Sequence, residues 1–330
     1  MNHVPTSKTL TVNRSAMTRG LFRWLPLFAL SLAMNPVRAD DEASVWLDKM
    51  GKALREQNYQ GIFTYMRGHQ FDTVEVIHRF RDGQESERLA HLNGEPREVV
   101  RDGDEVICIH ARTDQPDFDH NALRGPFTHA FNQNLATYQE FYNFNMKGTD
   151  RIAGRQAVTI DITPKNNDRY GYRLWLDEDS GLLLQSHLIN RGRVLEVFQF
   201  SRVEIGEPIE DQALASSLGD DVIEHSLTSP VIAQADAVKP QWKVSWLPRG
   251  FRPVRSDAPD RISFTDGIAT ISVFVEKSAN SNLGEVATKM GGTVVISRRL
   301  QKSSQQITVV GEVPMDTAKK IAESVEPVIY

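Results

Sequence analysis

The sequence predicts an α+β protein in which a large, curved, mostly antiparallel sheet is followed by a smaller α+β domain. First, apolar and polar residues alternate in many short segments between residues 59 and 205, as they do in strands with one buried face. Second, turns rich in Gly and Asp separate these segments at intervals of about 8 to 15 residues. Third, apolar residues recur at helical spacing just before this region and again near the end of the chain. We therefore expect a helix to cover part of each sheet.

Residues 17–39 have the organisation of a secretory signal peptide. A basic stretch precedes a short apolar run over 24–34, and small side chains at Val37 and Ala39 suit cleavage between Ala39 and Asp40. The alternative is a membrane anchor, which needs ~20 apolar residues, about twice the length of this run. We therefore expect residues 1–39 to be removed on export.

Two further features refine this expectation. Residues 1–16 form a polar extension ahead of an ordinary signal, so translation is expected to begin at Met17. The residues just after the apolar run include no cysteine that could be acylated to form a lipoprotein anchor. We expect a soluble, exported protein without a lipid anchor.

Charge limits the partners of the mature chain. The whole chain has 38 basic and 43 acidic residues, and five of the basic ones lie within 1–39, which contains no acidic residue. From Asp40 onward 33 basic residues therefore face 43 acidic ones, a net charge of −10. Nucleic acid is not expected as a partner, because its phosphates attract basic surfaces.

Cys108 is the one cysteine of the sequence, so an internal disulfide is impossible and stability depends on apolar burial. It lies in the apolar segment 106–109, which predicts a buried strand. No neighbouring residue would lower its pKa, and we expect an inert core thiol.

The first domain is expected to span residues 40–205. It opens with a helix whose Leu47 and Met50 fall on one face, and strands follow. Strict alternation at Tyr142 and Phe144 indicates a sheet with one buried face, whereas segment 194–205 is apolar on both faces. Either a helix covers the second face, or the curved sheet encloses an apolar concavity; the two explanations are compatible.

Residues 206–241 are expected to form an acidic linker. They contain seven acidic residues, one lysine and three prolines, a composition typical of a solvated spacer between domains.

The second domain is expected to span residues 242–330. Asp266 and Gly267 lie between two β-rich segments and favour a hairpin with a type I′ turn. Asp316 is the expected N-cap of a final helix, whose apolar residues recur at helical spacing and which ends at Pro327.

Motifs of catalysis are missing from the sequence, which has no nucleophile elbow, zinc-binding HExxH, phosphate loop or dinucleotide fingerprint. The best metal-ligand candidates lie between 110 and 129, but their spacing matches no known ligand pattern: His110, Asp114, Asp117, Asp119, His120 and His129. We expect neither an enzyme nor a cofactor or metal site.

Aromatic residues on the predicted strands are the candidate ligand-binding positions. Core packing explains such residues as well, so both roles stay open. The candidates for an apolar concavity are Phe63, Tyr65, Tyr142, Phe144, Trp175 and Phe198.

A family resemblance is visible in ten segments, which follow one another in the family's order along nearly all of the mature chain. They are Tyr59–Tyr65, Ile77–Arg79, Leu92–Arg101, Arg151–Arg155, Arg169–Asp177, Ser180–Leu182, Trp246–Phe251, Asp266–Ala269, Ser272–Glu276 and Val309–Pro314. This ordered set resembles the MucB/RseB family, periplasmic regulators of the envelope-stress sigma-factor pathway. The resemblance implies a first domain like the LolA/LolB-type lipoprotein carriers, an unclosed β-barrel with covering helices.

The resemblance also implies a function. The chain would bind the periplasmic segment of a single-span membrane anti-sigma factor, shield it from regulated proteolysis, and release it on a lipid or lipopolysaccharide-type signal of envelope stress. It further implies self-association into a homo-oligomer, and it offers no catalytic residue to carry over. The alternative function is that of a periplasmic lipid or lipoprotein carrier, which the first domain alone would suit.

Overall fold

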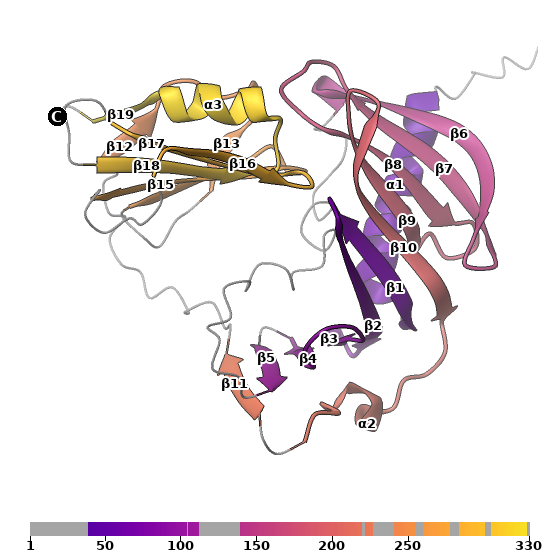
Figure 1. Ribbon diagram of the computed structural model, residues 1–330. Coiled ribbons are helices and arrows are strands. Elements are labelled where there is room, and N and C mark those ends of the chain that lie inside the picture. The colour runs from indigo at the N-terminus through magenta and orange to yellow at the C-terminus, as the bar shows by residue number, and fades with distance from the viewer. Residues whose placement is uncertain are drawn as a thin grey trace, which may run out of the picture. The chain divides into compact units, whose positions relative to one another are not determined.

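The computed structural model describes residues 39–103, 105–111, 139–219, 222–226, 241–254, 260–277, 284–300 and 305–328 (Figure 1). The predicted signal segment before Ala39 lies outside these residues. Within them, no helix is long and apolar enough to cross a membrane.

The first sheet is antiparallel throughout, and eleven of its strands lie in the described parts of the chain. Their order is β11-β5-β4-β3-β2-β1-β10-β9-β8-β7-β6, so β11 and β6 are the two edges and the sheet does not close on itself. The strands are β1 (Tyr59–Arg67), β2 (Gln70–Arg81), β3 (Gln84–His91), β4 (Arg97–Asp102), β5 (Glu105–Ala111), β6 (Tyr142–Ile152), β7 (Arg155–Pro164), β8 (Gly171–Asp177), β9 (Leu183–Asn190), β10 (Arg193–Ile205) and β11 (Val222–Ser226). The predicted α+β class and the large, open sheet are confirmed.

Helix α1 (Ala39–Glu56) packs against this sheet, mainly at β6. Its residues Leu47 and Met50 are fully buried in the same apolar cluster as Tyr142 and Phe144 of β6. Alternation along β6, with Asn143 and Asn145 exposed, follows the pattern of the sequence. A covering helix therefore accounts for at least part of the second apolar face.

The segment after β10 differs from the predicted spacer. Ile209 and Leu214, which flank and end the short helix α2 (Asp211–Leu214), pack on Ile77 of β2, and β11 pairs with β5. The prediction of a solvated linker is wrong over these residues, because scattered apolar side chains within an acidic stretch suffice to attach it to the sheet. Residues 227–240 lie outside the described part of the chain.

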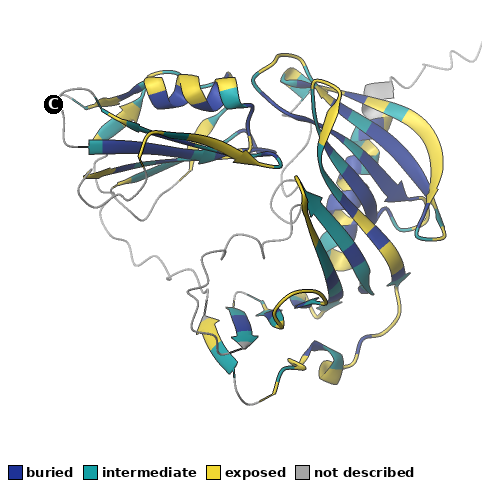
Figure 2. Cartoon of the chain, in the orientation of Figure 1, coloured by how far each residue is buried: buried dark blue, intermediate teal, exposed yellow. Residues whose placement is uncertain are grey.

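The second sheet has the order β13-β14-β15-β18-β17-β16. Its strands are β13 (Arg252–Val254), β14 (Arg261–Thr265), β15 (Thr270–Lys277), β16 (Val286–Met290), β17 (Thr293–Arg299) and β18 (Gln305–Gly311). Helix α3 (Met315–Glu323) lies against β17 and β18, with buried and exposed positions mixed along it (Figure 2). The strands β12 (Trp242–Val244) and β19 (Val325–Pro327) pair separately.

Three local predictions in this part need correction. Helix α3 begins at Met315, with Pro314 instead of Asp316 at the N-cap, because the fixed φ of proline suits that position. It ends at Glu323 and not at Pro327, since Val325–Pro327 forms strand β19 and pairs with β12. The β14–β15 hairpin exists, but four residues connect the strands instead of a two-residue type I′ turn. The reason is that the Asp266 carboxylate accepts hydrogen bonds from the backbone of Ile268 and Ala269, which widens the turn.

Candidate functional site

Five of the six candidate aromatic residues lie on one face of the first sheet. Strand register places Tyr65 opposite Phe198, and Phe63 opposite Phe200. Residues on this side of β10 pair with residues on the same side of β9, and the pairing continues in this way through β8 and β7. It reaches the side of β6 that bears Tyr142 and Phe144. We call this side, which α1 covers, the inner face.

Trp175 lies on the opposite face, because it alternates along β8 with Leu174, which lies on the inner face. Its indole Nε1 donates to Asp150 at 3.1 Å, and its ring centroid lies 4.6 Å from that of His187 in a T-shaped arrangement. Trp175 is thus separated by the sheet from the other five candidates.

The inner face has two parts. Tyr142 and Phe144 are buried beneath α1, at 1% and 0% exposure. Phe63, Phe198 and Phe200 form an aromatic cluster, with ring centroids 4.9 to 5.9 Å apart. Rings at these separations pack favourably against one another, so the structure brings these residues together as core. A ligand role for them stays a prediction.

Tyr65 connects the inner face to the second sheet. Its hydroxyl donates to Glu196 of β10, and burial together with that carboxylate raises the pKa of Tyr65. The other carboxylate oxygen of Glu196 accepts from the backbone N–H of Gly292, in the turn between β16 and β17, at 2.7 Å.

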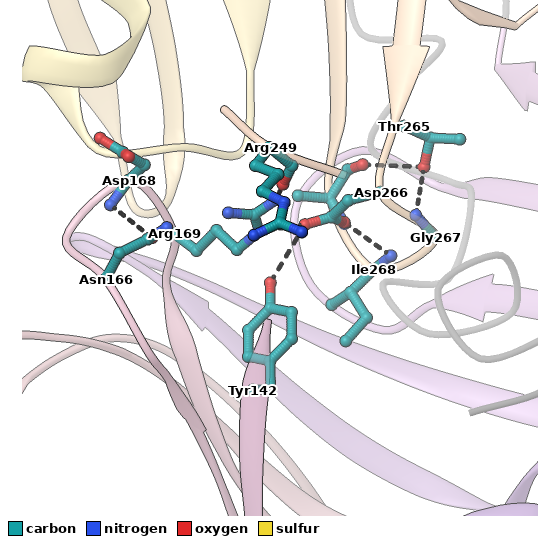
Figure 3. A network of polar contacts seen from close by, with 10 residues as sticks. Tyr142, Asn166, Asp168, Arg169, Arg249, Thr265, Asp266, Gly267 and Ile268 are labelled. Carbon is teal, nitrogen blue, oxygen red and sulfur yellow. Dashed lines mark hydrogen bonds and ion pairs between the residues drawn. The ribbon is translucent and has the colours of Figure 1, made fainter. Parts of the chain in front are cut away.

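An ion pair between Arg169 and Asp266 forms a second connection. The two sheets belong to one structural unit. Arg169 Nε donates to Asp266 at 2.6 Å, and neither side chain is exposed to solvent. The hydroxyl of Tyr142 donates to the same carboxylate at 3.3 Å, and Figure 3 shows the three side chains pointing toward one another.

Aromatic rings surround the guanidinium of Arg169. Its central carbon lies 4.9 Å from the ring centroid of Phe141 and 5.1 Å from that of Phe251. The ring faces attract the cation electrostatically, and the backbone carbonyl of Arg249 accepts a further hydrogen bond from it. The buried charge is therefore neutralised by Asp266 and enclosed by aromatic rings. Nε and Nη2 of Arg169 donate hydrogen bonds, whereas Nη1 has no hydrogen-bond partner among the described residues.

A third connection comes from Tyr170, whose hydroxyl donates to the backbone carbonyl of Val313 at 2.8 Å. Sequence reasoning missed all three connections. The sequence around Asp266 indicates an ordinary turn, and Arg169 has no periodic pattern around it. Both lie within segments of the family resemblance, which was the one signal that could have found them.

The metal candidates are mostly outside the described residues, which include His110 alone among them. Nε2 of His110 lies 3.1 Å from Nε2 of His225 on β11. Within the described residues, no three His, Cys, Asp or Glu side chains gather as a metal site would require.

Fold and contacts together define a two-domain α+β protein, in which an open antiparallel sheet is joined through buried polar contacts to a second, smaller sheet with its helix. Family models give this class a name. Residues 42–218 match the MucB/RseB N-terminal domain, and residues 236–326 match the MucB/RseB C-terminal domain. The chain belongs to the MucB/RseB family.

Individual relatives agree with this assignment. The chain is 37% identical over 312 residues to the sigma factor AlgU regulatory protein MucB of Pseudomonas aeruginosa, covering 90% of this chain and 95% of that protein. It is 26% identical over 321 residues to the sigma-E factor regulatory protein RseB of Escherichia coli K12, covering 91% and 97%. The family is thus one of sigma-factor regulatory proteins.

A solved structure extends the likeness to three dimensions. The MucB chain in the Pseudomonas aeruginosa MucA/MucB complex matches with a TM-score of 0.70 and 34% identity, over 88% of this chain and 100% of that chain. MucB in complex with MucA(peri) matches with the same TM-score of 0.70 at 32% identity, over 87% and 100%.

Proposed function

We propose that this chain is an exported periplasmic regulator that binds the periplasmic segment of a membrane anti-sigma factor and shields it from proteolysis. The observation that carries the proposal is the match over both sheets to MucB as it occurs in the MucA/MucB complex. The signal pattern of residues 17–39 supports export, and cleavage before Asp40 would leave residues 40–330 in two domains joined near 206–241.

In this function the chain acts by binding and without catalysis. A lipid-type envelope signal would release the partner, since two ligands that favour different states of one protein weaken each other by the same factor. Of the six candidate lipid contacts, Phe63, Tyr65 and Phe198 remain the proposed ones, because α1 covers Tyr142 and Phe144 and Trp175 lies on the opposite face. Self-association of the chain is part of the same proposal.

The carrier alternative receives less support from the geometry. An acyl chain entering the inner face at Tyr142 and Phe144 would have to displace Leu47 and Met50 of α1, which are fully buried there. Losing that apolar packing opposes such entry.

A binding experiment tests the proposal. The mature chain is titrated into labelled MucA(peri) from Pseudomonas aeruginosa, and trypsin digestion of MucA(peri) is followed with and without it. Saturable binding and slower digestion are expected, and a lipid dispersion added to the complex should weaken binding. An unrelated acidic protein at equal concentration is the control. No binding, or binding without protection, would contradict the proposal.

A further inference from the structure

A cavity of about 720 Å³ lies where three hairpin turns meet. The β1–β2 turn contributes Arg67 and His69, the β9–β10 turn contributes Arg193 and Val194, and the β16–β17 hairpin contributes Lys289, Met290 and Gly291. The remaining lining residues are Met66, Gly68, Gln70, Asn190 and Leu195.

The lining combines positive charge with exposed apolar surface. Arg67, Arg193 and Lys289 are basic, and no lining residue is acidic, although the chain as a whole is acidic. Val194 and Met290 are 45% and 43% exposed, and they belong to a small set of large apolar side chains that the described residues leave open. Such a surface favours a ligand with both acidic and apolar groups.

The carboxylate of Glu196 lies close to Gly291 but does not cancel this charge in the cavity. Glu196 is not a lining residue, and its two oxygens accept hydrogen bonds from Tyr65 and from the backbone of Gly292. Its charge is therefore partly satisfied by donors at the back of the turn.

Among the strands of the described residues, β16 has one backbone edge that pairs with no other strand, and this edge lies beside the cavity. It is an edge strand of the second sheet, it pairs with β17, and most of its residues are exposed. Met290 and Thr293 close a two-residue turn, so the antiparallel pattern directs the N–H and C=O groups of Ala287 and Lys289 away from β17. An extended peptide can pair with such an edge and use neighbouring pockets for its side chains.

We propose that β16 and this cavity form the docking site for an extended, acidic and apolar segment of the protein partner, which adds a strand to the second sheet. The inference rests on the proposed function and specifies where and how part of the partner binds. An apolar side chain of the segment enters between Val194 and Met290, and its carboxylates face Arg193 and Lys289. Lys289 on the edge of β16 also repels basic peptide segments, so the edge selects its partner by charge.

Two pairs of variants test the site in the full mature chain, with MucA(peri) as the probe. Ala287→Pro removes one outward N–H without breaking the β16–β17 ladder, and Ala287→Val keeps that N–H. The proline variant should weaken binding about tenfold, since a lost hydrogen bond and a poorer strand fit both contribute. The valine variant should stay within about twofold.

Charge is tested in parallel. Arg193→Glu combined with Lys289→Glu should weaken binding and flatten its salt dependence, because the attraction becomes a repulsion. Lys319→Glu, on the exposed side of α3, is the matched control and should bind as the wild type does. Hydrogen exchange of the wild-type chain gives a readout free of substitutions: the amides of Ala287 and Lys289 should become protected on binding.

Three outcomes would overturn the inference. If the wild-type chain does not bind MucA(peri), the proposed function fails and this inference fails with it. If it binds while the Ala287→Pro and double charge variants bind equally well and β16 gains no protection, this inference alone fails. If the charge variant loses affinity only for anionic phospholipid vesicles, the cavity is a lipid site and the peptide assignment is wrong.

Discussion

Two ion pairs in this chain have the same chemistry and opposite surroundings. Arg169 and Asp266 connect the two sheets with both side chains fully buried. Arg79 and Arg81 of β2 hold Asp211 of α2; this carboxylate is 75% exposed and Arg81 is 58% exposed, whereas Arg79 is 11% exposed. Water and salt screen the exposed contacts, whereas nothing replaces a missing partner in the interior. Burial therefore decides which pair is important for the fold.

A third pair lies between these extremes. Asp177 at the end of β8 is 1% exposed, and its partner Arg155 is 31% exposed. Substitution of the three carboxylates by asparagine keeps their size and removes their charge, which makes a graded test of the comparison.

The largest effect is expected for Asp266→Asn. The amide oxygen can still accept from Ile268 and Ala269, so the variant mainly leaves the Arg169 cation buried without its counter-charge. We expect a loss of about 3 to 5 kcal/mol in the free energy of unfolding, measured by urea denaturation.

A double variant distinguishes charge from packing. Arg169→Met with Asp266→Leu removes both charges and should be less destabilised than Asp266→Asn, because no uncompensated charge remains. Asp316→Asn, on an exposed pair with Arg191, serves as the control and should leave the urea midpoint unchanged. Equal stability of Asp266→Asn and wild type would show that the buried pair does not hold the sheets together.

An intermediate effect is expected for Asp177→Asn. Burial by itself would raise the pKa of Asp177, but hydrogen bonds from Arg155 and Ser180 outweigh it and lower that pKa below its ordinary value. The charged form is thus favoured in the folded state, and the stabilisation is present above the unfolded-state pKa and lost as pH falls through the folded one.

The corresponding measurement compares urea midpoints of wild type and Asp177→Asn from pH 7 down to pH 3. The variant should lose about 1 to 3 kcal/mol at pH 7, and the difference should shrink below about pH 4. Two parallel pH profiles, with a constant gap, would contradict the assigned cause.

The sequence predicted those elements whose side chains repeat with a regular period. Helix α1 and alternation at Tyr142 and Phe144 follow directly from burial of one face, and the structure has them where the pattern indicated. Segment 209–226 has no period, since its attachment depends on isolated residues such as Ile209 and Leu214 meeting Ile77 from a distant strand. Local pattern carries no information on such contacts.

The candidate site shows the same limit. Alternation could place Phe63 and Phe198 on strands, but the face on which Trp175 lies depends on the register of β8 with its neighbours. Asp266 illustrates the deeper difficulty, because an Asp-Gly pair has an ordinary local explanation as a turn. Its buried partner, Arg169, is 97 residues away in the sequence, and only the fold brings the two together.

The smallest effect is expected for Asp211→Asn, which tests the exposed end of the comparison. Water already competes for the exposed Asp211 carboxylate, and the largely buried Arg79 keeps its hydrogen bond to the Ile209 carbonyl. The global urea midpoint should therefore be unchanged at high salt and almost unchanged at low salt. The local effect should be visible instead: amides of residues 209–218 should exchange faster with solvent, because the segment loses its contacts with Arg79 and Arg81. Ile209, Leu214 and the hydrogen bonds of Ser217 to Glu98 should still keep it attached to the sheet. Ile209→Ser is the matched apolar substitution, and it should speed exchange more than Asp211→Asn does, since it removes buried surface. If Asp211→Asn lowered the midpoint as much as Asp266→Asn, exposure would not govern the weight of these ion pairs, and the contrast between the two regions would be wrong.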